Sequence, residues 1–418
     1  MSFWNRLRTP AQPTVPALAR PLDTALACAL AALGFFLPFS PAGVSVSMLA
    51  LLLLALAAAP SVWRSAPWRE PAMAAGLLLL AWIAIHTLWS SGFSREAANT
   101  INRYHELAVA PLLLALFLLV SRKRAFLLGL ALGAGLYAIV QWAALLSPPL
   151  ALSLQPRRIS AGFGLAVCAF VLLEQARHEA RPWIMRGLAL FLAATVLFAI
   201  DGRTGHVVLL VLLACAAWQH SPRRWRWGAM VAMPVLAVVL VLVVGSNGMR
   251  SRITETMSGT QAMADGALSS TGIRIELLRN GLDLAERNFI AGGGYANYEQ
   301  LHLQAARERY AGDPVRRHYL GAAWTATRNP HNEYLMQLVG GGAVALVLLL
   351  AWLALPLVRA TQPGRNCALA GVALAFAAGC LFNSLLMDFV EGHLYMALLA
   401  WLLAQAAQPA VDPGTGAV

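Results

Sequence analysis

Charged residues are scarce in this chain. Only 12% of its 418 residues are charged, about half the share that is usual in soluble domains. Acidic residues number 19, and Lys123 is the single lysine among 31 basic residues. Apolar runs recur along the whole length and 59% of the residues are hydrophobic, so no soluble domain can be set apart. The composition excludes an ordinary soluble protein and indicates a chain embedded in a membrane.

Common catalytic motifs are lacking as well. The sequence has no Walker-type phosphate loop, no nucleotide-binding glycine pattern after a strand and no His-Glu-x-x-His zinc helix. No Asp-x-Asp pair stands on a predicted outer loop, which argues against a metal-dependent sugar transferase. Acidic residues inside the apolar runs are few, whereas ion-coupled transporters usually place such groups at mid-membrane. The five cysteines show no metal-ligand spacing and are expected to be buried thiols: Cys28, Cys168, Cys215, Cys367 and Cys380.

Apolar runs of membrane-spanning length are abundant. A membrane-spanning helix needs roughly 20 mainly apolar residues. Twelve segments approach this requirement: 22–39, 43–60, 72–90, 106–121, 125–146, 160–176, 184–201, 204–219, 227–246, 332–358, 367–386 and 391–408. The sequence therefore predicts an all-α polytopic integral membrane protein of about 12 transmembrane helices, with 1–418 forming a single transmembrane domain. The first run is expected to be an uncleaved span, because a second run follows closely.

The distribution of arginine and lysine predicts the topology. With the N-terminus in the cytoplasm, the inner segments hold sixteen Arg and Lys residues and the short outer loops hold five. This excess favours both ends inside. The net charge of +12 comes from arginines in loops between apolar runs, so anionic lipid or a phosphorylated ligand is a better partner than nucleic acid. The long hydrophilic segment 246–330, between spans nine and ten, falls outside, and a loop of this length usually has a function.

The second half of this loop has helical periodicity. Residues 271–287 predict an amphipathic helix near the membrane surface, and Arg274 falls on its apolar side. A turn of three glycines at 292–294 follows, and then a second helix at 298–310. The polar side of the first helix carries Glu276, Arg279, Asp283 and Arg287, and the apolar side carries Ile273, Leu277, Leu278, Leu282 and Ala285.

The sharpest local pattern is the sequence RNPHNEY at 328–334, where the tenth span opens. We expect Asn329 to cap the helix, Pro330 to take its first position and His331 to lie in the first turn. The positive end of the helix dipole disfavours an imidazolium there, so the histidine stays neutral and can accept a proton. The spacing equally fits a histidine that only hydrogen-bonds at a helix start.

Arginines gather on the predicted outer face. Arg157, Arg158, Arg203 and Arg274 stand near span ends or on the surface helix. Because arginine makes paired hydrogen bonds to phosphate and keeps its charge, several that converge could hold a diphosphate without a metal. Contacts to lipid headgroups, or local ion pairs such as that of Arg203 with Asp201, are the alternative for each one.

Three further polar residues, Asp388, Glu391 and His393, fall in the last predicted outer loop. They could orient a catalytic group or contact a sugar. A solvated turn is the alternative, above all for Glu391 and His393.

Around these residues the chain resembles the bacterial O-antigen ligases, within the O-antigen ligase/polymerase superfamily. The family motif is His, then Asn, Ser or Gln, nine residues, Gly, two residues, and Gly, Thr or Tyr. Here His331-Asn332 is followed by nine residues and Gly342, and Ala345 departs from the last position. An arginine in the loop helix (Arg274) and one at the outer start of an earlier span (Arg203) also match.

The resemblance implies a GT-C-like fold and an enzyme of lipopolysaccharide biosynthesis in the bacterial inner membrane. Such a ligase transfers O-antigen polysaccharide from undecaprenyl diphosphate to the lipid A-core on the periplasmic side, without metal or cofactor. His331 would be the catalytic base. Arg203, Arg274 and Arg158 would bind the diphosphate, and Asn332, Arg328 and Asp388 would support the site. An O-antigen polymerase and, in another class, a lipid-linked sugar flippase are the alternatives.

Overall fold

The computed structural model describes residues 18–147, 158–200, 202–244, 270–314, 327–360 and 367–407. Regular secondary structure within these ranges is helical throughout. Six helices are long and apolar enough to cross a membrane: Pro71–Ser91, Arg95–Leu119, Arg124–Leu146, Ile159–His178, Glu333–Ala360 and Phe389–Ala406. The predicted polytopic helical membrane protein is therefore confirmed. The count of about 12 spans stays a prediction.

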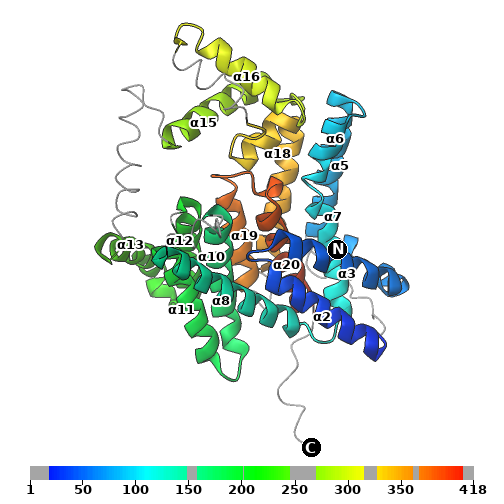
Figure 1. Ribbon diagram of the computed structural model, residues 1–418, viewed down its shortest axis with the longest axis vertical. Helices are drawn as coiled ribbons and strands as arrows, with labels where there is room; N and C mark the ends of the chain where they lie inside the picture. The colour runs from blue at the N-terminus through cyan, green and yellow to red at the C-terminus, as the bar shows by residue number, and fades with distance from the viewer. Residues whose placement is uncertain are drawn as a thin grey trace, which may run out of the picture.

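Each of the twelve predicted segments contains a helix, and further helices lie between them (Figure 1). In chain order they are α2 (Arg20–Phe36), α3 (Pro41–Ala57), α4 (Ala59–Ser65), η1 (Pro67–Arg69), α5 (Pro71–Ser91), α6 (Arg95–Asn102), α7 (Glu106–Leu119), α8 (Arg124–Leu146), α10 (Arg158–Gln175), η2 (Ala176–His178), α11 (Pro182–Phe198), α12 (Arg203–His220), η3 (Arg223–Trp225), α13 (Arg226–Val244), α15 (Ser270–Arg287), α16 (Tyr298–Arg309), α18 (Glu333–Ala360), α19 (Cys367–Gly379), η5 (Leu385–Met387) and α20 (Phe389–Ala406). Between Pro41–Ala57 and Ala59–Arg69 the chain bends by 92°.

One face of the bundle, here called the site face, holds the starts of α10, α12 and α18 and the end of α19. A Cβ atom placed on Gly162 would lie 3.0 Å from the Cα of Gly205, so α10 and α12 cross at backbone distance near their first residues. Gly379, the last residue of α19, lies beside the ring of Phe163 of α10, 3.5 Å from where its Cβ atom would be. Small residues allow such close helix crossings, which supply the packing that stabilises membrane bundles.

On the opposite face of the bundle, hydrogen bonds connect the ends of other helices. Near the start of α2, Asp23 accepts a hydrogen bond of 2.8 Å from the backbone N–H of Ser121, just beyond α7. Lys123 donates to the carbonyl of Ala404 at the end of α20, over 3.1 Å. Which face is periplasmic stays a prediction.

Helix α20 is the centre of the core. Its residues from Val390 to Ala404 are all buried. Tyr395 stacks on Phe376 of α19, with ring centroids 4.0 Å apart, and meets Trp352 of α18 edge to face at 5.4 Å. Exposed leucines lie on outer helices, such as Leu53 of α3 and Leu132 of α8. Lipid is the natural environment for such side chains.

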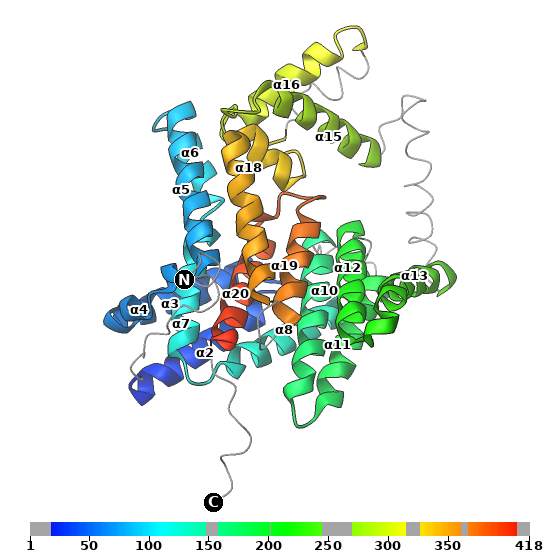
Figure 2. The same ribbon diagram turned by 180° about the vertical axis from the view of Figure 1, so that it is seen from behind.

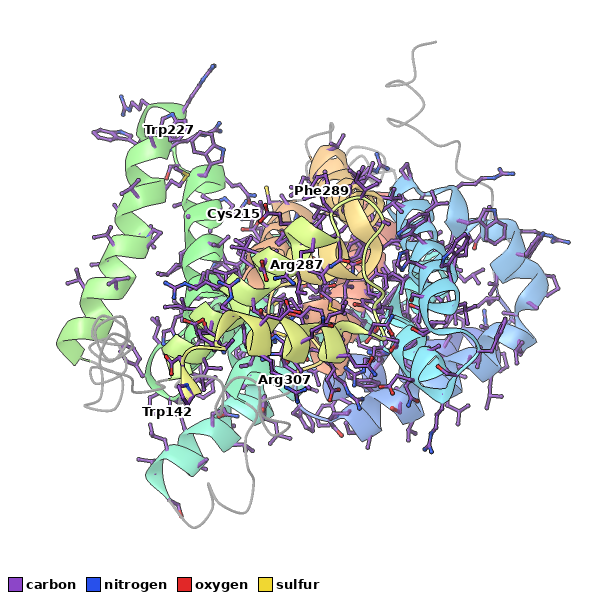
Figure 3. The ribbon with its side chains drawn as sticks, turned by 90° about the horizontal axis from the view of Figure 1, so that it is seen from above. Trp142, Cys215, Trp227, Arg287, Phe289 and Arg307 are labelled. Carbon is purple, nitrogen blue, oxygen red and sulfur yellow. The ribbon has the colours of Figure 1, made fainter. Side chains whose placement is uncertain are left out.

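Helices α15 and α16 form a hairpin beyond the site face, beside the start of α18 (Figure 2). The two helices predicted in the loop are therefore confirmed. Part of the polar side of α15 packs against α16: Glu276 accepts from Arg279 over 3.0 Å and from Tyr310, and Asn280 donates to His302. Arg279 and Arg287 of the same side are exposed. Viewed from above, the hairpin with Arg287 and Arg307 lies across the other helices (Figure 3). Residues 245–269, the first part of the predicted loop, lie outside the described ranges.

Candidate functional site

His331 lies just before α18, in an unusual backbone conformation. Its φ is +50°, in the left-handed region. The helix begins at Glu333, and the Oδ1 of Asn332 accepts from the backbone N–H of Leu335 over 3.0 Å. The prediction that Asn329 caps the helix and that His331 lies in its first turn is therefore wrong. Asn332 takes the capping position instead.

Asn329 acts on His331 instead. Its Oδ1 accepts from the backbone N–H of His331 over 2.9 Å. Left-handed backbone is tolerated by histidine better than by branched residues, but it still costs roughly 1–2 kcal/mol. Positive φ at a non-glycine residue must be held by its surroundings, and such residues cluster at functional sites.

The imidazole of His331 faces a residue that the sequence analysis missed. Its Nδ1 lies 3.0 Å from the Oδ1 of Asn383, in the turn between α19 and α20. The Nδ2 of Asn383 donates to the Oδ2 of Asp388 over 2.5 Å. The chain thus brings His331 and Asp388 together through Asn383. The only signal in the sequence was a polar residue near the end of the predicted run 367–386, five positions before Asp388.

The two other predicted supporting residues have structural contacts. Asn332, besides capping α18, donates from Nδ2 to the carbonyl of Leu381 over 3.0 Å. Arg328 is exposed and pairs with Glu299 of α16 at 3.2 Å and with Glu96 of α6 at 3.8 Å. Both residues therefore tie the segment that carries His331 to neighbouring elements.

The carboxylate of Glu333 holds the start of α18 through hydrogen bonds. It is fully buried, and its Oε2 accepts from the backbone N–H of Leu386 over 3.1 Å. Its Oε1 accepts from Gln337, and Gln337 in turn accepts from the hydroxyl of Tyr295 over 2.6 Å. Burial and the nearby carboxyl of Glu333 raise the pKa of Tyr295 well above its usual value, so this hydroxyl keeps its proton and donates.

The glycine of the family motif sits at a break in α18. Gly342 has a φ of +72°, and a Cβ atom there would lie 2.2 Å from the carbonyl oxygen of Ile290. Around the break the backbone pairs with the three-glycine turn: Gly293 N–H donates to Val339 over 2.7 Å and Gly294 N–H to Gly340 over 3.0 Å. Only glycine fits this approach and this φ. Ala345, the departure from the motif, is fully buried in α18.

Two of the predicted arginines are the first residues of helices that begin on the site face. Helices α10 and α12 begin at Arg158 and Arg203, but these two side chains, like Arg157 and Asp201, lie outside the described part of the chain. Arg274 is half-buried on α15, two turns before Gly281 and on the same side of that helix. A Cβ atom on Gly281 would lie 3.4 Å from the Cβ of Pro330 and 3.1 Å from Leu335, which flank His331 in sequence.

A second cluster lies where α7 meets α20. Donor atoms of His105, Glu106 and His393 lie within 4.8 Å of one another. Glu106 of α7 is buried, and so are Glu391 and His393 of α20. Glu391 and His393 therefore do not form a solvated turn. Each imidazole Nδ1 also contacts a backbone carbonyl, that of Asn102 at 2.6 Å and that of Phe389 at 2.8 Å. Two imidazoles and a carboxylate could hold a divalent cation.

Residues 188–350, from α11 into α18, match the model of a family described as O-antigen ligase. The matched stretch contains Arg203, Arg274, His331 and Gly342. No curated protein matches the chain.

Proposed function

We propose that this protein is an O-antigen ligase that transfers O-antigen polysaccharide from undecaprenyl diphosphate to the lipid A-core, because its residues 188–350 match the model of a family described as O-antigen ligase. The observation that carries the proposal is the placement of His331. The amide groups of Asn329 and Asn383 hold it just before α18, and His331 lies within the region of the family match. This match supports a glycosyltransferase that acts on lipid-linked polysaccharide. The particular donor and acceptor are the proposed part.

His331 is the proposed base. A sugar hydroxyl is a weak nucleophile, and a positioned base typically speeds its attack by about 10²–10⁴-fold. The hydroxyl oxygen of the core sugar bonds to the anomeric carbon of the donor, and its proton passes to His331. The bond from that carbon to the diphosphate oxygen breaks, and the electron pair leaves with the diphosphate. Attack from the face opposite the leaving group inverts the anomeric centre. A product that retained the donor's configuration would contradict this direct displacement.

Arginines are the proposed ligands of the diphosphate. Arg274 lies on α15, two turns before the Gly281 that packs beside the start of α18, and α10 and α12 begin at Arg158 and Arg203. Fixed cations aimed at a developing negative charge lower the barrier to its departure. Planar guanidinium groups, which do not lose their charge, match phosphate oxygens in pairs. These three residues could therefore stabilise the leaving group without a metal.

The proposed topology has about 12 spans in the inner membrane, with 246–330 as a periplasmic loop. Arginine-rich connections on one face of the bundle and the candidate site on the other support it. Several buried carboxylates of the described spans lie near helix ends: Glu333 begins α18, Glu391 is in the first turn of α20 and Glu174 is near the end of α10, whereas Glu106 lies inside the span Arg95–Leu119. This placement favours a site at the membrane surface over the mid-membrane path that a flippase would need.

Metal independence can be tested on the purified enzyme, with the cluster of His105, Glu106 and His393 as the place to look if it fails. We expect transfer to survive chelation of divalent cations. Activity that is lost on chelation and restored by one cation would overturn metal independence. Glu106→Gln would then weaken the response to that cation if the cluster is where the ion acts.

Deletion of the gene tests the reaction itself. A ligase mutant loses the O-antigen ladder from its lipopolysaccharide, while lipid-linked polymer accumulates. A polymerase mutant instead leaves a core capped with a single repeat, and that outcome would make the protein a polymerase. His331→Ala should copy the deletion, with an expected loss of at least about 10²-fold in transfer rate. His178→Ala, which changes an exposed histidine on the opposite face, is the matched control and should restore the ladder. A normal ladder with His331→Ala at normal membrane levels would refute the base assignment.

A further inference from the structure

Asn383 stands between the candidate base and a carboxylate. It is buried, with 5% of its surface exposed. Its Oδ1 lies 3.0 Å from Nδ1 of His331, and its Nδ2 donates to Asp388. Backbone contacts fix both ends, since the N–H of Asn383 donates to Gly379 over 3.0 Å and that of His331 to Asn329 over 2.9 Å. The spacing of the three groups is therefore set by the backbone as well as by their side chains.

The chemistry of the three groups gives the contacts one direction. An ionised carboxylate can only accept hydrogen bonds, so Asp388 must face the NH₂ group of Asn383. The amide oxygen, which can also only accept, is then turned to His331. Nδ1 of His331 must therefore carry the proton and donate it. In a neutral imidazole this leaves the lone pair on Nε2.

We propose that Asn383, oriented by Asp388, is a positioning residue that holds His331 in the tautomer with its proton on Nδ1. Nε2 is then the atom that takes the proton of the acceptor hydroxyl. This inference rests on the proposed function and deepens it. The arrangement follows the logic of catalytic triads, in which a third group sets the tautomer and the orientation of the base. Here a neutral amide touches the imidazole and the carboxylate lies one step further away.

The hydrogen-bonded series of His331, Asn383 and Asp388 is here called the relay. Charged groups near it affect how the relay responds to pH. Asp388 is the carboxylate in contact with Asn383. Glu333, two residues after His331, is held by Leu386 and Gln337. Glu106 of α7 lies within electrostatic reach of both Glu333 and Asp388. None of these carboxylates is the direct hydrogen-bond partner of the imidazole, so a carboxylate placed there would stabilise the imidazolium more strongly than the amide does.

A charge exchange between positions 383 and 388 tests the relay. In Asn383→Leu the imidazole loses its partner, and in Asp388→Asn the amide of Asn383 loses its orientation. Asn383→Asp sets two carboxylates side by side. Each single change should lower kcat/KM of the purified enzyme by about 10²-fold, as expected when a base is misoriented. The double variant Asn383→Asp with Asp388→Asn restores the direction of the hydrogen bonds, because the new carboxylate accepts from both neighbours.

The double variant should regain activity to within about tenfold of wild type, because one restored charge-assisted hydrogen bond offsets most of the loss. The acid limb of its kcat/KM profile should move to higher pH, because the imidazolium now faces a carboxylate directly. A double variant no better than the single ones, with an unshifted profile, would show that Asn383 only supports the fold. An Asn383→Leu enzyme with wild-type kinetics would likewise show that Asn383 does not position the base. Thermal stability of each variant identifies losses due to unfolding, and the rescue with its pH shift does not depend on them.

The same assay separates this inference from the proposed function. A wild-type enzyme that transfers nothing from undecaprenyl-diphosphate-linked polysaccharide to lipid A-core overturns the function and the role of Asn383 with it. Normal transfer by wild type together with normal kinetics in every variant overturns the relay alone.

Discussion

At the scale of single residues, the site depends on amide side chains more than on charges. Asn329 fixes the backbone of His331, Asn332 caps the following helix and Asn383 faces the imidazole. Neutral amides make directional hydrogen bonds without bringing a new charge next to a base. In the proposed function the cationic groups are the arginines, and of the three proposed ones Arg274 is the one whose side chain the structure describes.

Arg274→Ala should lower kcat/KM by about 10²-fold, the usual effect of removing one group that stabilises a developing anion. Arg274→Lys should recover only part of this loss, because an ammonium group cannot make the paired hydrogen bonds of a guanidinium. Initial rates of transfer with purified enzyme measure both.

Arg287→Ala on the same helix is the control. Arg287 is exposed and pairs with Asp283 and Glu308 at the surface, where ion pairs contribute little. Its rate should stay near that of wild type. Equal losses in the Arg274 and Arg287 variants would point to damage to the hairpin instead of loss of a diphosphate ligand.

At the scale of elements, the break in α18 joins the segment with His331 to the loop hairpin. The N-terminal part of α18 carries Glu333 and Gln337, and the residues around Gly342 pair with the three-glycine turn that precedes α16. Trp82 of α5 adds a hydrogen bond of 2.9 Å to the carbonyl of Gly341. The hairpin, α5 and the start of α18 therefore share one set of contacts.

Gly342→Ala should disturb this junction. A left-handed φ costs a side chain about 1–2 kcal/mol, and the carbonyl of Ile290 must also move away. We expect a lower midpoint of thermal unfolding in detergent and a loss of transfer. Gly187→Ala, in α11 where a Cβ meets nothing within 4 Å, should be neutral or stabilise by up to about 1 kcal/mol. A Gly342→Ala protein as stable and active as Gly187→Ala would contradict the role of the break.

Local patterns made some of these elements predictable. Helices α15 and α16 follow from periodicity within the loop, and His331 stood out because an Asn-Pro pair precedes it. The choice of cap could not be made from sequence, because Asn329 and Asn332 suit the position equally. The role of Asn383 could not be predicted for another reason: its partner His331 lies 52 positions away in the sequence. Only the packing of α19 against α18 brings the two together.

At the scale of the whole molecule, the bundle has two unlike faces. The site face carries the hairpin, the start of α18 and the turn that contains Asn383. The opposite face carries most of the arginine-rich connections and ion pairs such as Arg124 with Glu179 at 3.9 Å. The positive-inside rule predicts that the site face is periplasmic, as the proposed topology has it.

Cysteine labelling tests this assignment. In a Cys28→Ser background, Glu308→Cys on α16 should react with a membrane-impermeant maleimide in intact spheroplasts. Arg181→Cys, before α11, should react only after lysis. Both positions are exposed, so a difference in reactivity reports on the side of the membrane. The reverse pattern would place the site in the cytoplasm and would contradict the proposed transfer to a periplasmic acceptor.

The contacts of the three-glycine turn also have a mechanical meaning. The turn joins the hairpin to α5 and α18, and further along α15 a Cβ atom on Gly281 would lie 3.4 Å from the Cβ of Pro330, the neighbour of His331. The hairpin is therefore attached to the bundle at two places, at its turn and at Gly281. A rotation of the hairpin about the turn alone would pull Gly281 away from Pro330, so α15 and the segment that carries His331 should move as one unit.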